Sequence, residues 1–292
     1  MSEPLRVRPS QTLSHDVGDY PDGMVLAVNK PLRWSSADVI RKLKFAAIRH
    51  FGKKNLKVGH AGTLDPLAEG VLLVCIGAAC KRAEEFQRHD KEYVADLVFG
   101  ATTPSYDLEK EPDRFFPYEQ IDRAKIEAIL PKFLGEQMQV APLFSAKSID
   151  GVRAYELARK ALRSGGPVKD GLLRESRIVI HELELLDFGK YEPPSGSADG
   201  ADKNASTAEN GSARNASFRI HLADASALKG HPLARLRIRC SKGTYIRALA
   251  RDIGEALGSG AFLSRLIRTA SGDFRLEEAL SLQDALSLFE RR

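Results

Sequence analysis

Apolar and polar residues follow two periods along this chain, one typical of strands and one typical of helices. Short apolar or alternating stretches predict strands at residues 23–29, 71–76, 92–99, 177–186, 218–222 and 233–240. Apolar residues at helical spacing predict helices over about 37–51, 119–134, 153–163, 245–257 and 277–289. Because strands and helices are interspersed, the pattern indicates a mixed α/β or α+β fold.

Short local signals indicate where some of these elements begin and end. Ser35 or Ser36 can cap the first predicted helix, and Thr244 can cap the helix that Gly258 ends. Asp150-Gly151 is typical of a hairpin turn. In the strand at 233–240, arginines alternate with apolar residues, which predicts one basic and one apolar face.

One segment cannot contribute to a core. Of the 23 residues at 195–217, 20 are Ser, Gly, Ala, Asn, Asp or Thr, and none is large and apolar. Such a segment cannot offset its ordering entropy, so we expect a flexible insertion at 190–217 between two strands. We expect residues 1–22 to form a poorly ordered extension and residues 23–292 to form one catalytic domain.

Composition excludes several classes of protein. The 292 residues are 43% hydrophobic and 28% charged, which is typical of a globular protein and not of a disordered or collagen-like chain. No apolar run is long enough to span a membrane, and residues 1–23 lack the apolar core of a secretory signal. We therefore expect a cytoplasmic protein with Cys75, Cys80 and Cys240 as reduced thiols, since their spacing matches no zinc site.

Positive charge is unevenly distributed along the chain, although the net charge is only +5. Residues 41–60 carry seven Lys or Arg and no Asp or Glu, and residues 229–268 have a net charge of +7. Such segments can present a basic surface to a nucleic acid, and they are our candidates for an RNA-binding surface. Two solvated faces without a partner are the alternative that charge leaves open.

A glycine-bearing loop is the strongest candidate for chemistry. Residues 57–70, KVGHAGTLDPLAEG, lead from the first basic segment into the apolar stretch 71–76. Pro66 restricts Asp65 to extended backbone, which can hold its carboxylate rigidly at the mouth of a cleft near His60. An Asp-Pro turn beside a solvated histidine is the alternative for these residues alone.

Five separated motifs occur in order over about residues 22–275. They are Lys30-Pro31 with Ser35-Ser36, Gly59 to Gly70, Lys91-Glu92-Tyr93, Ser145 to Arg159, and Cys240 to Arg247. Together they resemble the tRNA pseudouridine synthase B (TruB) family. The resemblance implies the pseudouridine synthase fold, with a mainly antiparallel central sheet flanked by helices and loops. It also implies isomerisation of the uridine at conventional position 55 in the T stem-loop of tRNA.

The resemblance further implies that the reaction needs no cofactor and no metal. We expect a monomer that acts on tRNA, without membrane association and without an obligate protein partner. Only 20 residues follow Gly272, too few for the C-terminal RNA-binding PUA domain of many family members. We therefore expect a short form without that domain.

The same resemblance implies roles for particular side chains. Asp65 matches the essential nucleophile, and Arg247 matches the arginine that pairs with it. Tyr93 matches the tyrosine that stacks on the flipped base, and Tyr245 matches a second tyrosine of the pocket. Lys30 and Pro31 are expected to shape the neighbouring loop, without a chemical role.

Two further residues complete the expected site. Leu266 resembles the apolar floor under the base, and His60 matches a residue that fills the space vacated by flipped nucleotides. Without the motifs, Tyr93 and Leu266 would be assigned to the core, Arg247 to phosphate binding and His60 to a solvated loop. Glu69 stands where a small Thr or Ser is common, which brings negative charge near Asp65, and no role is assigned to Asp107.

Two other functions are consistent with the sequence. An RNA-binding or tRNA-folding protein would need the basic surfaces but not Asp65. A related synthase that acts on another RNA would need both. The Asp65 carboxylate is thus the feature that separates an enzyme from a binding protein.

Overall fold

One sheet extends through the molecule, and two small sheets, short helices and 3-10 turns surround it. The strands of the main sheet are β1 (Leu5–Val7), β2 (Met24–Lys30), β3 (Val58–His60), β4 (Ala68–Ile76), β5 (Lys91–Phe99), β8 (Gly135–Val140), β11 (Glu175–Lys190), β12 (Pro232–Cys240), β13 (Ala261–Ser271), β14 (Phe274–Arg275) and β15 (Leu280–Ser281). The small sheets pair β6 (Ala101–Thr102) with β7 (Arg114–Phe115) and β9 (Ser148–Ile149) with β10 (Val152–Arg153). The helices are α1 (Ser36–Phe51), α2 (Ala83–Arg88), α3 (Arg123–Ile129), α5 (Ile246–Ala256) and α6 (Leu282–Ser287), with 3-10 turns η1 (Val17–Asp19), η2 (Gly77–Arg82), η3 (Leu130–Phe133), η4 (Ser226–Leu228) and η5 (Leu276–Glu278).

The main sheet has the strand order β1-β2-β4-β13-β5-β12-β11-β8, with β3 on β4, β14 on β13 and β15 on β2. Only the pairs β1–β2, β4–β13 and β2–β15 are parallel among the described strands. This computed structural model describes residues 3–142, 144, 148–149, 152–153, 175–193 and 222–290. The expected fold class, with strands and helices mixed around a mainly antiparallel central sheet, is confirmed.

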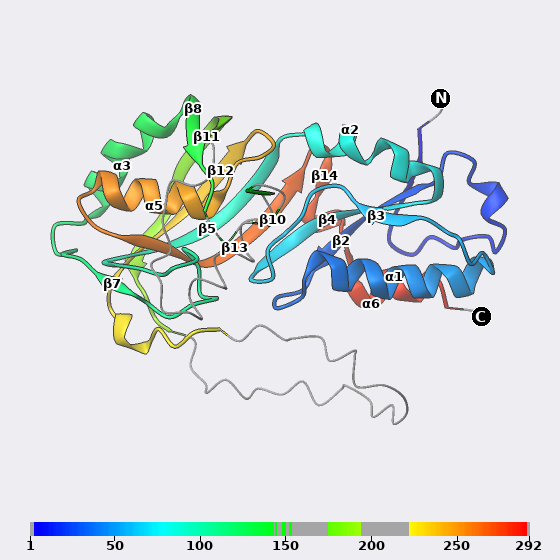
Figure 1. Ribbon diagram of the computed structural model, residues 1–292, viewed down its shortest axis with the longest axis horizontal. Helices are drawn as coiled ribbons and strands as arrows, with labels where there is room; N and C mark the ends of the chain where they lie inside the picture. The colour runs from blue at the N-terminus through cyan, green and yellow to red at the C-terminus, as the bar shows by residue number, and fades with distance from the viewer. Residues whose placement is uncertain are drawn as a thin grey trace.

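The helices cover different parts of this sheet, as Figure 1 shows. Helices α1 and α6 pack on each other beside β2, and α5 packs on β13 and β5. Strands β5 and β13 cross the middle of the molecule and join the part that carries α1 to the part that carries α3 and α5. The meeting point of these two parts is therefore the centre of the sheet.

Helix α1 shows how the sequence fixes a local element. Ser35 is its N-cap and forms a capping box with Asp38, and Gly52 ends the helix in the left-handed conformation. Val39 and Leu43 are fully buried against the sheet, which agrees with the apolar face of the helical pattern. The cap and the buried face together determine both the start and the orientation of the helix.

Two predicted helices are shorter than the pattern indicated. The region 119–134 forms α3 and then the 3-10 turn η3. The helix begins only after its N-cap Asp122, whose side chain accepts a hydrogen bond from Lys125 N, and Pro131 cannot donate a helical hydrogen bond. The region 277–289 forms η5, then β15, and only then α6, which Ser281 caps. Thr244 does not cap α5, because its hydroxyl donates to the carbonyl of Ser241 and Tyr245 is the N-cap residue.

The expectation of poor order at the N-terminus is wrong for part of residues 1–22. Residues 5–7 form β1, which pairs in parallel with β2, and Leu13 is buried in the core. Residues 190–193, at the start of the predicted insertion, are also structured, because β11 runs to Lys190 and Tyr191 is buried. Residues 194–217, residues 154–163 of the predicted helix at 153–163, residues 218–221 of the predicted strand at 218–222 and the turn at Asp150-Gly151 lie outside the described residues.

The structure also bears on two expectations from composition, namely that no segment spans a membrane and that the three cysteines are thiols. None of the helices in the described part of the chain is long and apolar enough to cross a membrane. Cys75, Cys80 and Cys240 are free thiols, and burial raises the pKa of both Cys75 and Cys240 to about 12.

Gly70 allows β4 and β13 to approach each other at the centre of the sheet, and it provides a first test. Its φ is +99°, and a Cβ there would lie 2.2 Å from the carbonyl oxygen of Arg268. Gly52 has a φ of +62° with nothing within 4 Å of the added atom. We expect Gly70→Ala to lower the free energy of unfolding by roughly 1–3 kcal/mol more than Gly52→Ala, because overpacking adds to backbone strain. Denaturant titration measures both variants, and equal losses would contradict the close approach.

Candidate functional site

A loop at residues 61–67, between β3 and β4, carries Asp65 and is called the Asp65 loop below. Its backbone is held from α1 by Ser36, whose hydroxyl accepts from Leu64 N at 2.9 Å and donates to Leu64 O at 3.0 Å. Lys30 is fully buried and donates through Nζ to the carbonyls of Pro31, Trp34 and Pro66 at 2.8, 2.6 and 3.3 Å. These contacts agree with the structural role expected for Lys30.

Arg268 holds the other side of the same loop. Its guanidinium donates to the carbonyl oxygens of Gly62 at 3.2 Å, Thr63 at 3.4 Å and Val71 at 2.6 Å, and the residue is only 1% exposed. Charge along the chain predicted that Arg268 belongs to a basic surface, and the structure corrects this. The sequence could have indicated this burial, because Arg268 lies two residues after Leu266 on β13, and alternate residues of a strand share a face.

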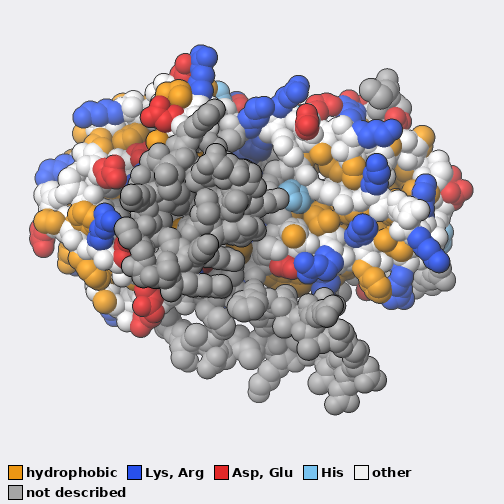
Figure 2. Space-filling model, viewed as in Figure 1, with side chains coloured by type: hydrophobic (Ala, Val, Ile, Leu, Met, Phe, Trp, Pro, Cys, Tyr) orange, Lys and Arg blue, Asp and Glu red, His pale blue; other side chains and the backbone are white. Residues whose placement is uncertain are grey.

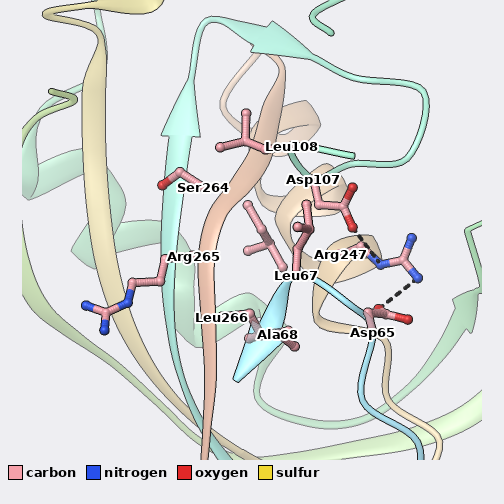
Figure 3. A pocket seen from close by; sticks show the side chains of 10 residues that line it. Asp65, Leu67, Ala68, Asp107, Leu108, Arg247, Ser264, Arg265 and Leu266 are labelled. Carbon is pink, nitrogen blue, oxygen red and sulfur yellow. Dashed lines mark ion pairs between the residues drawn. The ribbon is translucent and has the colours of Figure 1, made fainter. Parts of the chain in front are cut away.

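Asp65 projects from this loop toward an arginine at the start of α5. Arg247 Nη2 lies 2.9 Å from Asp65 Oδ2, and Figure 3 shows the guanidinium between Asp65 and Asp107. The Arg247 side chain is 5% exposed, whereas the Asp65 side chain is 41% exposed. Solvent and small molecules can therefore reach the carboxylate, while the cation beside it is buried.

Backbone carbonyls fix the position of Arg247. Its Nη1 donates to Ser105 O at 3.0 Å, and its Nη2 also donates to Phe144 O at 2.9 Å. Burial opposes the charge, but the carboxylates of Asp65 and Asp107 together raise the pKa of Arg247 above its ordinary value. Arg247 therefore remains charged and orients Asp65 through a charge-assisted hydrogen bond.

Asp107 is a third member of this group, to which the sequence motifs assigned no role. Its Oδ2 lies 3.7 Å from Arg247 Nε, and its Oδ1 accepts from the Ser105 hydroxyl at 2.6 Å and from Glu109 N at 2.9 Å. Burial raises the pKa of Asp107 even though Arg247 lowers it. The second carboxylate thus faces the arginine from the side opposite Asp65 (Figure 3).

A cavity of about 470 Å³ opens beside Asp65. Five of the six expected site residues line it, namely Asp65, Tyr93, Tyr245, Arg247 and Leu266. They come from the Asp65 loop, β5, the residue before α5, α5 itself and β13. The volume lies in the range of sites for small organic ligands, so a single nucleoside is a suitable occupant.

The aromatic and apolar walls of the cavity are fixed by their own neighbours. Tyr93 is 8% exposed, and burial raises its pKa. Gln139 clamps the backbone of Tyr245, since its side chain accepts from Tyr245 N at 2.8 Å and donates to Tyr245 O at 3.2 Å. Leu266 pairs with Ala68 where β13 and β4 run in parallel, which brings both residues to the cavity wall.

His60, the sixth expected residue, is not among the residues that line this cavity. It lies on β3 opposite Val74, and its Nδ1 is buried without a hydrogen-bond partner among the described residues. Burial and the nearby Arg268 lower its pKa. A neutral imidazole beside the Asp65 loop can make van der Waals contact with RNA. The role expected for His60, filling the space vacated by flipped nucleotides, stays a prediction.

The charges around the cavity favour an anion. Lys91, Lys242, Arg247 and Arg268 line it together with one carboxylate, that of Asp65. Lys91 Nζ donates to the carbonyls of Gln87 and His89, each at 2.5 Å, and burial lowers its pKa to about 8. Such a cavity suits a ligand that carries phosphates.

The Glu69 carboxylate, which was expected to bring negative charge near Asp65, faces an arginine of the neighbouring strand. It lies 3.8 Å from Arg265 Nε on the neighbouring strand β13, and Arg265 points away from Asp65 in Figure 3. Within the described residues, no three His, Cys, Asp or Glu side chains gather as they would around a metal ion.

The buried ammonium of Lys30 generates a pH-dependent prediction. Burial lowers its pKa to about 8, well below the ordinary lysine value. Between pH 8 and 10.5 Lys30 therefore binds more protons in the unfolded chain than in the folded chain, so Lys30 contributes a rise in the free energy of unfolding with pH, whereas the buried thiols Cys75 and Cys240 contribute a fall. Lys30→Met should make the slope of the free energy of unfolding against pH less positive than in the wild-type protein. Denaturant titrations from pH 7 to 10.5 measure it, with the exposed Lys132→Met as control; an unchanged slope in Lys30→Met would refute the assignment.

The carbonyl contacts of Arg268 give another test. Arg268→Met leaves the buried acceptors of the Asp65 loop without donors, which should lower the free energy of unfolding by roughly 3 kcal/mol or more. Arg268→Lys keeps the charge but reaches fewer carbonyls, so its loss should be intermediate. The neighbouring Arg265, whose side chain is 55% exposed, provides the control Arg265→Met, for which we expect about 0.5 kcal/mol or less. Similar losses at positions 265 and 268 would contradict the role of Arg268.

Known proteins share both the sequence pattern and the arrangement of this chain. The N-terminal domain model of the TruB family of pseudouridylate synthases matches residues 49–199, and the tRNA pseudouridylate synthase B C-terminal domain model matches residues 247–291. The chain is 44% identical to tRNA pseudouridine synthase B of Phocaeicola vulgatus over 91% of this chain and 92% of that protein. It is 48% identical to the Bacteroides thetaiotaomicron protein of the same name over 90% and 91%, and 40% identical to that of Thermus thermophilus over 88% and 76%.

A solved structure of a known protein has a similar fold. The Cbf5-Nop10-Gar1 complex contains a chain that matches with a TM-score of 0.55 and 24% identity, over 91% of this chain and 54% of that one. This chain thus spans about half the length of the solved chain, and the likeness concerns the fold alone. The two family domains and the identity over nine-tenths of its length show that this chain belongs to the TruB family of pseudouridylate synthases.

Proposed function

We propose that this chain is a tRNA pseudouridine synthase that isomerises the uridine at conventional position 55 of the T loop. One observation carries the proposal: the Asp65 carboxylate is accessible at a cavity of about 470 Å³ and paired with the buried Arg247. The relatives named tRNA pseudouridine synthase B, which match along nine-tenths of this chain, support the choice of substrate.

The reaction rearranges the substrate without adding or removing atoms. The bond between C1′ of the ribose and N1 of the uracil breaks, the base rotates, and C1′ joins C5. The proton leaves C5, and N1 carries a proton in the product. A carboxylate can act as a nucleophile here, because it forms a covalent adduct and later releases it. We assign this role to Asp65, which Arg247 keeps oriented toward the cavity.

The remaining wall residues fit a base that has left its stack. Extrusion of a nucleotide from a folded loop costs a few kcal/mol, and the pocket must replace the lost stacking. Tyr93 offers an aromatic face, which contributes roughly 1–3 kcal/mol per base. We assign Leu266 to the floor under the base and Tyr245 to the pocket wall, and we assign His60 to the space that the flipped nucleotides vacate.

We further infer how the protein works as a whole. We propose a monomer that needs no obligate protein partner, since the chemistry assigned to Asp65 and Arg247 requires no residue from a second chain. The isomerisation requires no change of oxidation state, and the family resemblance supports a reaction without metal or cofactor. We expect this tRNA-modifying enzyme to act in the cytoplasm.

Asp65→Asn provides the central test. The amide is similar in size but a poor nucleophile, so we expect pseudouridine formation to fall by at least about a thousandfold while tRNA affinity stays within about threefold. Tritium release from tRNA labelled at C5 of uridine measures turnover, and filter binding measures affinity. The exposed Asp113→Asn serves as a control with normal activity.

Each outcome of this experiment separates one assignment from another. Full turnover by Asp65→Asn would show that the nucleophile is wrongly assigned. A wild-type protein that binds tRNA but forms no pseudouridine would favour the alternative, an RNA-binding or tRNA-folding protein. Product mapping in the wild-type reaction identifies which uridine is modified, so modification at another site or RNA would correct the substrate.

A further inference from the structure

A basic surface extends from the Asp65 loop along α1 and is not part of the cavity. It consists of Arg41, Lys42, Lys44, Lys53, Lys54 and Lys57, all exposed, and we call it the α1 basic surface. No Asp or Glu occurs between residues 41 and 60. In Figure 2, Lys and Arg side chains gather on the right of the face shown, over α1.

The second basic segment of the sequence behaves differently from the first. The arginines of β12 are paired: Arg235 with Asp96 at 2.7 Å, Arg239 with Glu182 at 3.0 Å, and Arg237 with Glu184. Their charge is largely neutralised across the strands of the sheet. The expectation that the whole strip at 229–268 presents a basic surface to RNA is therefore corrected.

Among the described residues, the lysines of the α1 basic surface have no such carboxylate partners. Arg41 pairs with Asp38 at 2.8 Å, and Lys42 lies over the Trp34 ring. Lys44, Lys53, Lys54 and Lys57 form no ion pair with any carboxylate in the part of the chain that the structure describes. Their positive charge is therefore available to a partner from outside the protein.

The geometry of α1 determines where that partner lies. The helix buries Val39, Leu43 and Ala47 on one side, so Arg41 lies on the opposite side, and Lys42 and Lys44 lie on the two flanks of the exposed face. Phe45 lies among these cations and is 66% exposed. The 16 residues of α1 extend about 24 Å at 1.5 Å per residue. Because Ser36 bonds to Leu64, this row of cations begins at the Asp65 loop.

We propose that the α1 basic surface binds the phosphodiester backbone of the tRNA whose T loop enters the cavity. The inference rests on the proposed function and adds the place where RNA outside the cavity is held. Phosphates spaced along a strand match a row of flexible lysines, and their binding releases counterions. Phe45 supplies an aromatic face for a sugar or an unpaired base beside these phosphates.

Removal of the charges tests this surface without touching the cavity. The variant Lys42→Gln/Lys44→Gln/Lys53→Gln/Lys54→Gln loses four positive charges. The matched control Lys125→Gln/Lys132→Gln/Lys190→Gln/Lys229→Gln loses four from the opposite end of the molecule (Figure 1). Both variants are compared with wild type by circular dichroism, by tRNA binding at several salt concentrations, and by steady-state turnover.

We expect the α1 variant to bind tRNA roughly tenfold or more weakly at 0.1 M salt. The slope of log affinity against log salt should become shallower by about 1 for each lost phosphate contact. Its KM should rise while kcat stays unchanged, because the residues around Asp65 are intact. The control should resemble wild type in every measurement.

Several results would overturn the inference. They are unchanged tRNA affinity in the α1 variant, an equal loss in the control, and a fall in kcat with normal KM. Binding of vesicles with anionic lipid by wild type but not by the α1 variant, with equal tRNA affinity, would assign the surface to a membrane instead. A wild-type protein that forms no pseudouridine would refute the proposed function, whereas active variants with normal KM would refute only this inference.

Discussion

The ion pair between Asp65 and the buried Arg247 is the interaction on which the site depends. A buried guanidinium is stable only where its charge and its donors are matched, and here two carboxylates and two backbone carbonyls match them. Since Arg247 is fixed by the carbonyls of Ser105 and Phe144, it cannot follow a displaced Asp65. The carboxylate therefore keeps one orientation, and its remaining surface faces the cavity.

The Asp65 loop is rigid for a related reason. A loop of this kind has few backbone hydrogen bonds of its own, and unpaired buried carbonyls would destabilise it. Lys30 and Arg268, both almost completely buried, donate to carbonyls on its two sides, and Ser36 binds Leu64 between them. Two buried cations thus stabilise the loop by donating to its carbonyl groups, while the Asp65 carboxylate pairs with a third cation, Arg247.

Positive charge has three different uses in this molecule. On β12 it forms cross-strand ion pairs that belong to the sheet, while on α1 and the residues after it lysines face solvent without described carboxylate partners. Around the cavity, buried cations orient a carboxylate and make the site favourable to a phosphate-bearing ligand. The proposed RNA contact uses the solvent-facing lysines on and after α1, and the proposed isomerisation uses the buried cations around the cavity.

The sequence by itself determined the fold class, the strands β2, β4, β5, β11 and β12 and the capped start of α1, and it predicted five residues that line the cavity, but it missed the central strand β13 and Asp107. Periodicity and motifs carry this information because they depend on neighbours in the chain. Residue 65 and its proline predicted a fixed carboxylate, and the motif at 240–247 supplied Arg247. The same local reasoning overestimated the helices at 119–134 and 277–289, where caps and sheet pairing decided the ends.

Only the tertiary structure decided which charges are buried and which are free. Arg235 and Arg268 look alike in the sequence, yet one forms an ion pair with Asp96 on the sheet and the other is buried against the carbonyls of the Asp65 loop. Asp107 faces Arg247 although the two are far apart along the chain. The physical reason is that ion pairing and desolvation depend on distances of a few ångströms between strands and loops, and the packing of the sheet sets these distances.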